Sequence, residues 1–83
     1  MRYIGETLTT ESKEFIIKRE TKWCIYVTTE NCQKDISIGK MSLRKNEKGF
    51  YVEFENVITH TDWQLNELGF KNSKIRKQLK YNK

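Results

Sequence analysis

The chain has 83 residues, of which 36% are hydrophobic and 33% are charged. So short a chain can build only one hydrophobic core, and we therefore expect a single domain over residues 1–83. No apolar run approaches the roughly 18 residues that a membrane-spanning helix requires, and Met1 to Glu6 lack the apolar stretch of a signal peptide. These absences predict a cytoplasmic protein without membrane contact.

The formal net charge of +5 is unevenly distributed along the chain. All 11 acidic residues and ten of the 16 basic residues lie in residues 1–70, which are therefore close to neutral. Residues 71–83 hold the other six basic residues and no acid. One interpretation is a solvated helix end, whose dipole favours cations. Because one or two cations would satisfy the dipole, the alternative is a contact surface for phosphates or for an acidic protein face.

The first part of the chain, residues 1–58, predicts strands. A strand is weakly marked at Tyr3 to Leu8, and the residues after it, 9–12, could instead begin a short helix. Residues 13–19 are β-branched at their centre, and residues 23–29 alternate, with Trp23, Ile25 and Val27 on one face. Polar segments that are typical of turns follow each of these two strands.

Residues 35–44 alternate as well, but the apolar positions change parity at Gly39–Lys40, which predicts a β-bulge at Gly39. Residues 45–49 predict a five-residue hairpin loop that ends in a glycine. In the strand that follows, Phe50, Val52 and Phe54 point inward. Strands joined by short polar turns indicate an antiparallel β-meander, here of three to five strands.

The residues from 61 to 83 change to a helical period. Thr61 with Gln64 three positions later fits a capping box, so a helix should begin near Asp62. In one interpretation Gly69 ends this helix, and Asn72 or Ser73 caps a second one that runs to about Tyr81. In the other, one helix continues through Gly69. It then carries a stripe that would pack on the sheet or pair with another copy of the chain, formed by Leu65, Leu68, Asn72, Ile75 and Leu79. The expected fold is thus α+β, with a C-terminal helix or helical hairpin packed on the meander.

The sequence predicts no enzyme, metal site or cofactor. His60 is the only histidine, and it lies 28 or more residues from Cys24 and Cys32, so no metal-ligand spacing is present. The four glycines are scattered and form no phosphate-binding loop. Catalysis needs several convergent groups and a pocket, for which we expect little room in a chain of this length. The two cysteines are interpreted as reduced thiols in or near strands, with a Cys24–Cys32 disulfide as the alternative.

Residues 65–80 resemble the helix-turn-helix of Cro-type phage repressors. In that motif an apolar residue and a glycine close the first helix, an apolar residue follows in the turn, and a β-branched residue lies midway along the second helix. These places are held here by Leu68, Gly69, Phe70 and Ile75. The resemblance implies that Ile75 is buried and that the second helix lies in the major groove of DNA. It makes the candidate DNA contacts Asn72, Ser73, Lys74, Arg76 and Lys77.

Two functional hypotheses follow, both of a small non-catalytic binding or regulatory protein. In the first, the C-terminal segment binds nucleic acid through Lys71, Asn72, Ser73, Lys74, Arg76, Lys77 and Lys80. In the second, the protein is an inhibitor or adaptor that occludes a host or defence nucleoprotein machine. The exposed face of the sheet, with Tyr26 and Tyr51, is a further candidate contact. The lack of alanine and proline indicates an AT-rich genome, such as a low-GC bacterium or its phages or plasmids.

Overall fold

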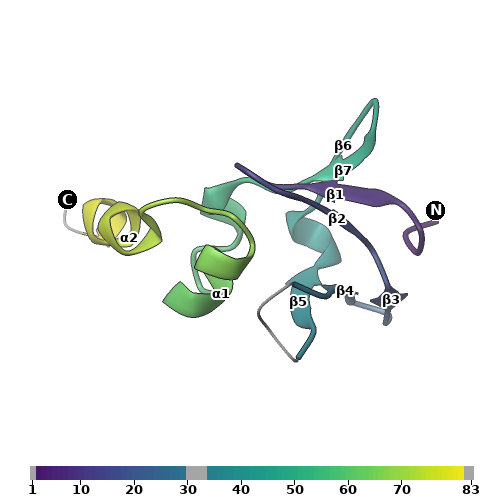
Figure 1. Ribbon diagram of the computed structural model, residues 1–83, viewed down its shortest axis with the longest axis horizontal. Coiled ribbons are helices and arrows are strands. Elements are labelled where there is room, and N and C mark those ends of the chain that lie inside the picture. Colours follow the sequence, from purple (N-terminus) through teal and green to yellow (C-terminus); the bar gives the residue numbers. More distant parts are fainter. Residues whose placement is uncertain (1, 30–33, 82–83) are drawn as a thin grey trace.

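The computed structural model describes residues 2–29 and 34–81, with the side chains of all of these except Lys80 and Tyr81. The chain is α+β, as expected (Figure 1). The strands are β1 (Thr7–Thr9), β2 (Glu14–Ile16), β3 (Arg19–Glu20), β4 (Cys24–Val27), β5 (Ile36–Gly39), β6 (Arg44–Asn46) and β7 (Gly49–Tyr51). The helices are two short 3₁₀ turns, η1 (Lys40–Ser42) and η2 (Phe54–Asn56), and two α-helices, α1 (Asp62–Glu67) and α2 (Ser73–Tyr81).

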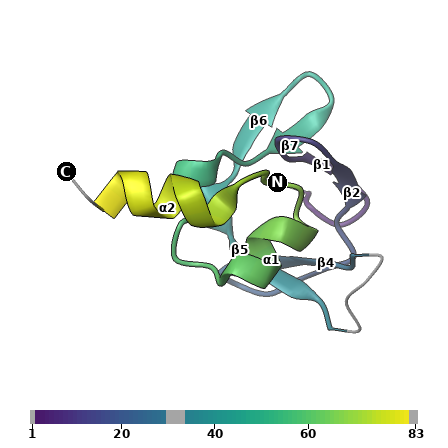
Figure 2. The ribbon, with the colours of Figure 1, turned by 60° about the vertical axis from the view of Figure 1, so that its left-hand side comes forward.

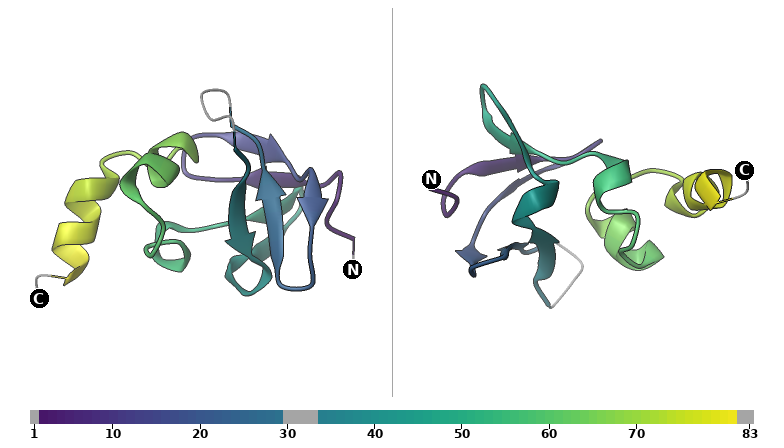
Figure 3. Two further views of the ribbon diagram at one scale, coloured as in Figure 1. Left: turned by 90° about the horizontal axis from the view of Figure 1, so that it is seen from below. Right: turned by 180° about the vertical axis from the view of Figure 1, so that it is seen from behind.

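The strands form two sheets and not the single meander that the sequence suggested. One sheet has the order β2-β1-β7-β6. The other has the order β3-β4-β5, and its three strands lie side by side in Figure 3, left. The second sheet is an antiparallel meander, and β1–β2 and β6–β7 are antiparallel pairs. However, β1 and β7 pair in parallel, with Leu8 opposite Phe50. The number of strands, seven among the described residues, exceeds the expected three to five because the chain leaves one sheet for the other twice.

The parity change at Gly39–Lys40 marks one of these crossings. The expected bulge at Gly39 is replaced by the end of β5, after which η1 carries the chain to β6 in the other sheet. The expected strand over residues 13–19 is divided in the same way, since β2 and β3 belong to different sheets. A short helix from residue 9 is not formed, because residues 10–13 make the turn between β1 and β2.

Alternate residues of both sheets meet in one hydrophobic core. Its buried members are Leu8, Ile17, Ile25, Val27, Ile36, Ile38, Leu43, Phe50, Val52, Phe54, Val57, Leu65, Leu68 and Phe70. The inward positions expected of Phe50, Val52 and Phe54 are therefore confirmed. Trp23 is the exception: it is 68% exposed, because it lies in the turn between β3 and β4.

A hairpin forms before β7, as predicted, but its loop is shorter than the expected residues 45–49, because β6 extends to Asn46 and β7 begins at Gly49. The side-chain oxygen of Asn46 accepts hydrogen bonds of 2.9 Å from the backbone N–H groups of Lys48 and Gly49. This arrangement closes the loop and aligns β6 with β7. The alternatives for the cysteines lie outside the description, because Cys32 is not among the described residues.

Two helices, and not one continuous helix, follow the sheets. The capping box is confirmed: the Thr61 hydroxyl accepts from Gln64 N, and the Gln64 side chain accepts from Thr61 N. At the other end of α1, Gly69 N donates to Asn66 O and Phe70 N to Leu65 O, which is the bonding pattern of a Schellman motif. Gly69 has a φ of +93°, so the chain turns there and the single-helix interpretation is wrong.

Candidate functional site

The turn between α1 and α2 is held by the turn between β1 and β2. The Thr10 hydroxyl donates to the carbonyl of Leu68, and the Ser12 hydroxyl donates to the carbonyl of Gly69 at 2.5 Å. Carbonyls at a helix end have no partner within the helix, so these two hydroxyls satisfy groups that would otherwise need water. The contact fixes where α2 begins and brings Glu11, which lies between the two hydroxyl residues, next to that helix.

Helix α2 stands at one end of the molecule and packs beside α1 (Figures 1 and 2). The side of α2 that faces the rest of the domain carries two cationic side chains, Arg76 and Lys77. Arg76 forms an ion pair with Glu11, and its guanidinium lies 4.4 Å from the ring centroid of Phe54. Lys77 Nζ donates to the carbonyl of His60 at 2.6 Å and lies 3.5 Å from a carboxylate oxygen of Asp62. Two of the cations that were expected to face a partner thus bind the chain's own polar groups.

The apolar residues of α2 point the other way. Ile75 is 56% exposed and Leu79 is 69% exposed. Residues four positions apart share a helix face, so the two side chains lie together. The burial of Ile75 that the repressor resemblance implied is therefore wrong for this structure, although Leu68 and Phe70 are buried at the turn as that motif requires.

The other residues of the C-terminal segment that were predicted to contact a partner differ in their exposure to solvent. Lys71, Asn72 and Lys74 are exposed, whereas Ser73 is buried. Neither Lys71 nor Lys74 makes an ion pair with any residue that the structure describes. Lys80 belongs to α2, but its side chain is outside the described part.

The two tyrosines proposed as a sheet-face contact belong to different sheets. Tyr26 lies on β4, and the guanidinium of Arg19 covers its ring at 4.3 Å from the centroid. Arg19 also lies 3.6 Å from a carboxylate oxygen of Asp35. Tyr51 lies on β7 and is half-buried. The two residues consequently do not form one surface.

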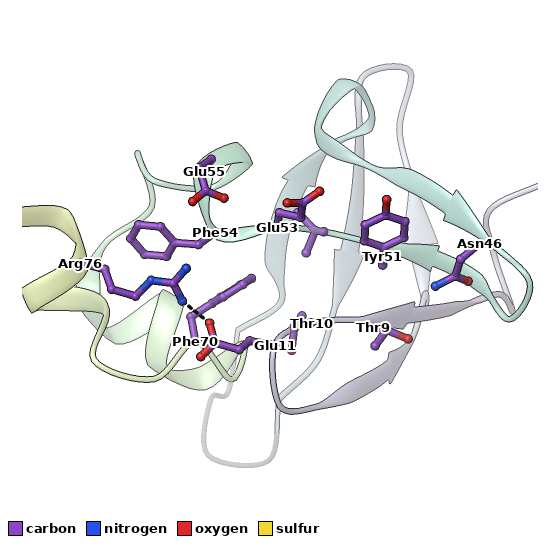
Figure 4. Close-up of a pocket in the computed structure, with 11 residues that line it drawn as sticks. Thr9, Thr10, Glu11, Asn46, Tyr51, Glu53, Phe54, Glu55, Phe70 and Arg76 are labelled. Atoms are coloured by element: carbon purple, nitrogen blue, oxygen red, sulfur yellow. Dashed lines mark hydrogen bonds and ion pairs between the residues drawn. The ribbon is translucent and has the colours of Figure 1, made fainter. Parts of the chain in front are cut away.

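Tyr51 lines a groove of about 440 Å³ on the outer face of the four-stranded sheet (Figure 4). The groove extends from β6 and β7 to α2, and its lining residues are Thr9, Thr10, Glu11, Asn46, Tyr51, Val52, Glu53, Phe54, Glu55, Phe70 and Arg76. The sequence predicts that Tyr51 lies on an exposed face of the sheet, but it does not predict the groove. No local signal could indicate it, because its lining residues come from β1, β7 and α2, which lie far apart in the sequence.

His60, the only histidine of the chain, has a structural contact. His60 precedes the N-cap of α1, and its Nε2 donates to the carbonyl of Ser37 at 2.7 Å. Within residues 2–29 and 34–81 there is no group of three or more histidine, cysteine or acidic side chains that could hold a metal ion. In the same part of the chain, no helix is long and apolar enough to cross a membrane.

Comparison with known proteins adds no relative. No protein-family model matches the sequence, and neither a curated protein nor a solved structure matches the chain. The functional argument therefore depends on the geometry of α2 and of the groove beside it.

Proposed function

We propose that this protein is a small non-catalytic adaptor or inhibitor that binds a protein partner through the exposed side of α2. The observation that carries the proposal is the orientation of this helix. Arg76 and Lys77 face the protein's own domain, while Ile75 and Leu79 face solvent. An amphipathic helix on a globular domain ordinarily has the opposite orientation, with its apolar side toward the core.

Single exposed apolar residues are common on protein surfaces and need no explanation. Here two of them share one face of a helix that stands at the end of the molecule (Figure 2). Apolar anchors spaced by three or four residues on a helix are the pattern that fits an apolar groove of another protein. Burying both side chains would stabilise a complex by about 1.5–3 kcal/mol for each side chain that becomes fully covered.

The charges around this face indicate the chemistry of the partner. Lys71 and Lys74 are exposed at the start of α2, and residues 71–83 contain no acid. A partner groove with an apolar floor and an acidic rim would match both features. Opposite charges at the rim would also speed association, because they steer the two proteins together before contact.

Nucleic-acid binding is the second candidate, and the exposure of Lys71 and Lys74 favours it. Free binding to phosphates would use these two lysines first, since Arg76 and Lys77 would have to leave Glu11 and Asp62.

The absence of alanine and proline supports a phage or mobile-element origin, and we place the activity in the cytoplasm of a bacterial host.

Site-specific photocrosslinking tests the main proposal. A photoreactive phenylalanine analogue is placed at position 79, and in a control at position 41, where Met41 is 90% exposed outside α2. Both variants are irradiated in a nuclease-treated lysate of a low-GC bacterium. We expect a protein adduct of discrete mass from position 79 only, and we expect Ile75→Ser to remove it.

An identical adduct from both positions would contradict the use of α2, because a real docking face is local. A mobility shift with random duplex or single-stranded DNA at about 50 mM salt, where phosphate contacts are still strong, decides the second candidate. Retention of DNA together with no protein adduct would favour nucleic-acid binding over the adaptor function.

A further inference from the structure

An arginine is held between an aromatic ring and a carboxylate at two places in this protein. Arg76 lies over the ring of Phe54 and pairs with Glu11. On the other sheet, Arg19 lies over Tyr26 and pairs with Asp35. A guanidinium gains from both partners at once, because the ring face attracts the cation while the carboxylate accepts its N–H groups.

The groove on the four-stranded sheet contains a third aromatic–carboxylate combination, formed by Tyr51 and Glu53. The chain is extended from β7 through Glu53, and residues two positions apart in an extended chain point to the same side. Both residues line the groove, and Figure 4 shows Tyr51 toward the end opposite Arg76, with Glu53 between the two. Unlike Glu11, Glu53 forms no ion pair with any described residue.

A second feature of this part of the groove is the hydroxyl of Thr9. The hydroxyl oxygen of Thr9 is buried and has no hydrogen-bond partner among the described residues. Thr9 is paired with Tyr51 across the parallel β1–β7 ladder and lines the groove beside it. Buried polar atoms normally have a partner, and a hydroxyl can either accept from an N–H group or donate to an acceptor.

We propose that the open end of the groove, formed by Thr9, Asn46, Tyr51 and Glu53, binds the arginine side chain of a basic peptide segment of a partner. The guanidinium would stack on the Tyr51 ring and pair with Glu53, as Arg76 does with Phe54 and Glu11 at the other end. The site lies on the sheet and not on the exposed face of α2, so it stands or fails separately from the adaptor function.

The groove has room for such a ligand and the charge to select it. Its volume of about 440 Å³ lies within the usual range for small-molecule and side-chain sites. Three carboxylates line it, and Arg76 is the only cation among its lining residues. With Glu11 engaged by Arg76, Glu53 is the carboxylate at the open end of the groove, and it favours a cationic ligand over a phosphate there.

Nuclear magnetic resonance titration with a defined probe tests this site. The probe is a capped pentapeptide with one central arginine between glycines, and the matched probe carries citrulline, which keeps the shape and loses the charge. We expect saturable shifts of the backbone signals of Thr9, Tyr51 and Glu53 with the arginine peptide only. Equal shifts with the citrulline peptide, or shifts confined to other parts of the chain, would overturn the proposal.

Matched substitutions separate the site from the general charge of the protein. Glu53→Gln should lower the affinity for the arginine peptide about fivefold, which is the upper range for the contribution of an exposed ion pair. Glu20→Gln removes the same charge from the other sheet, where Glu20 pairs with Lys40, and should leave the affinity unchanged. Equal weakening by both would refute the site. Tyr51→Leu should weaken binding of the arginine peptide, while Tyr26→Leu should leave it unchanged. If the Tyr51→Leu variant does not fold, the comparison of Glu53→Gln with Glu20→Gln still tests the site, because Glu53 is exposed.

Discussion

Replacing Gly69 by alanine tests how the turn between α1 and α2 positions the candidate site. Gly69 has a φ of +93°, a conformation that costs other residues roughly 1–2 kcal/mol. A Cβ atom at this position would lie 2.8 Å from Ser12 Oγ and 2.9 Å from Lys13 Cγ. Ser12 would have to move, and its hydrogen bond to the Gly69 carbonyl, worth about 1 kcal/mol, would be lost.

Together these contributions predict a loss of about 2 kcal/mol in the free energy of unfolding, after allowing roughly 0.4–1 kcal/mol for the stiffer unfolded chain. For a domain of this size the melting temperature should fall by about 8–16 °C. Urea and thermal unfolding followed by circular dichroism measure both quantities.

Gly5 provides a matched control for the contact with Ser12. Its φ of +89° is nearly the same as that of Gly69, but a Cβ atom there would meet nothing within 4 Å. Gly5→Ala should therefore cost only the conformational part, about 1 kcal/mol or less. If the two substitutions destabilise the protein equally, the close contact between the two turns is not what holds α2 in place.

Three further outcomes follow from the same structure. Thr61→Ala removes the capping hydroxyl of α1 and should lower the free energy of unfolding by about 1 kcal/mol in a urea titration; no change would mean that α1 does not depend on its cap. Ile75→Ser with Leu79→Ser should change that free energy by less than about 0.5 kcal/mol for each residue, because both side chains are exposed, and a larger loss would show that this face is covered within the protein. If duplex DNA binds through Lys71 and Lys74 alone, a salt titration should give a log–log slope of about −2, whereas a slope near −5 would require the other cations as well.

Several local features were correctly predicted because their causes lie within a few residues. The capping box at Thr61 and the hairpin turn before Gly49 each depend on hydrogen bonds between near neighbours, as does the break at Gly69, which was one of two alternatives that the sequence left open. The α+β class followed from the change of period near residue 60. The alternation of apolar residues also identified Phe50 and Val52 as core, because a strand with one buried face shows its pattern in the sequence itself.

The candidate site was predicted less well, because its partners are distant in the chain. Arg76 pairs with Glu11, 65 residues away, and no pattern within residues 71–83 could indicate that contact. The cations of that segment were therefore interpreted as free, and Ile75 was expected to be buried. In the structure Arg76 instead pairs with Glu11 and Ile75 is exposed, because α2 packs its charged side against the domain.

The amino-acid sequence alone thus determined the α+β class, the start of α1 and the position of the hairpin before β7, through short-range hydrogen bonds and the spacing of apolar residues. The tertiary structure decided which strands share a sheet, which side of α2 is exposed, and that Tyr51 and Glu53 meet Thr9 in one groove. The physical reason is that alternation shows which face of a strand is apolar but not which other strand covers it. That choice depends on packing the whole core at once.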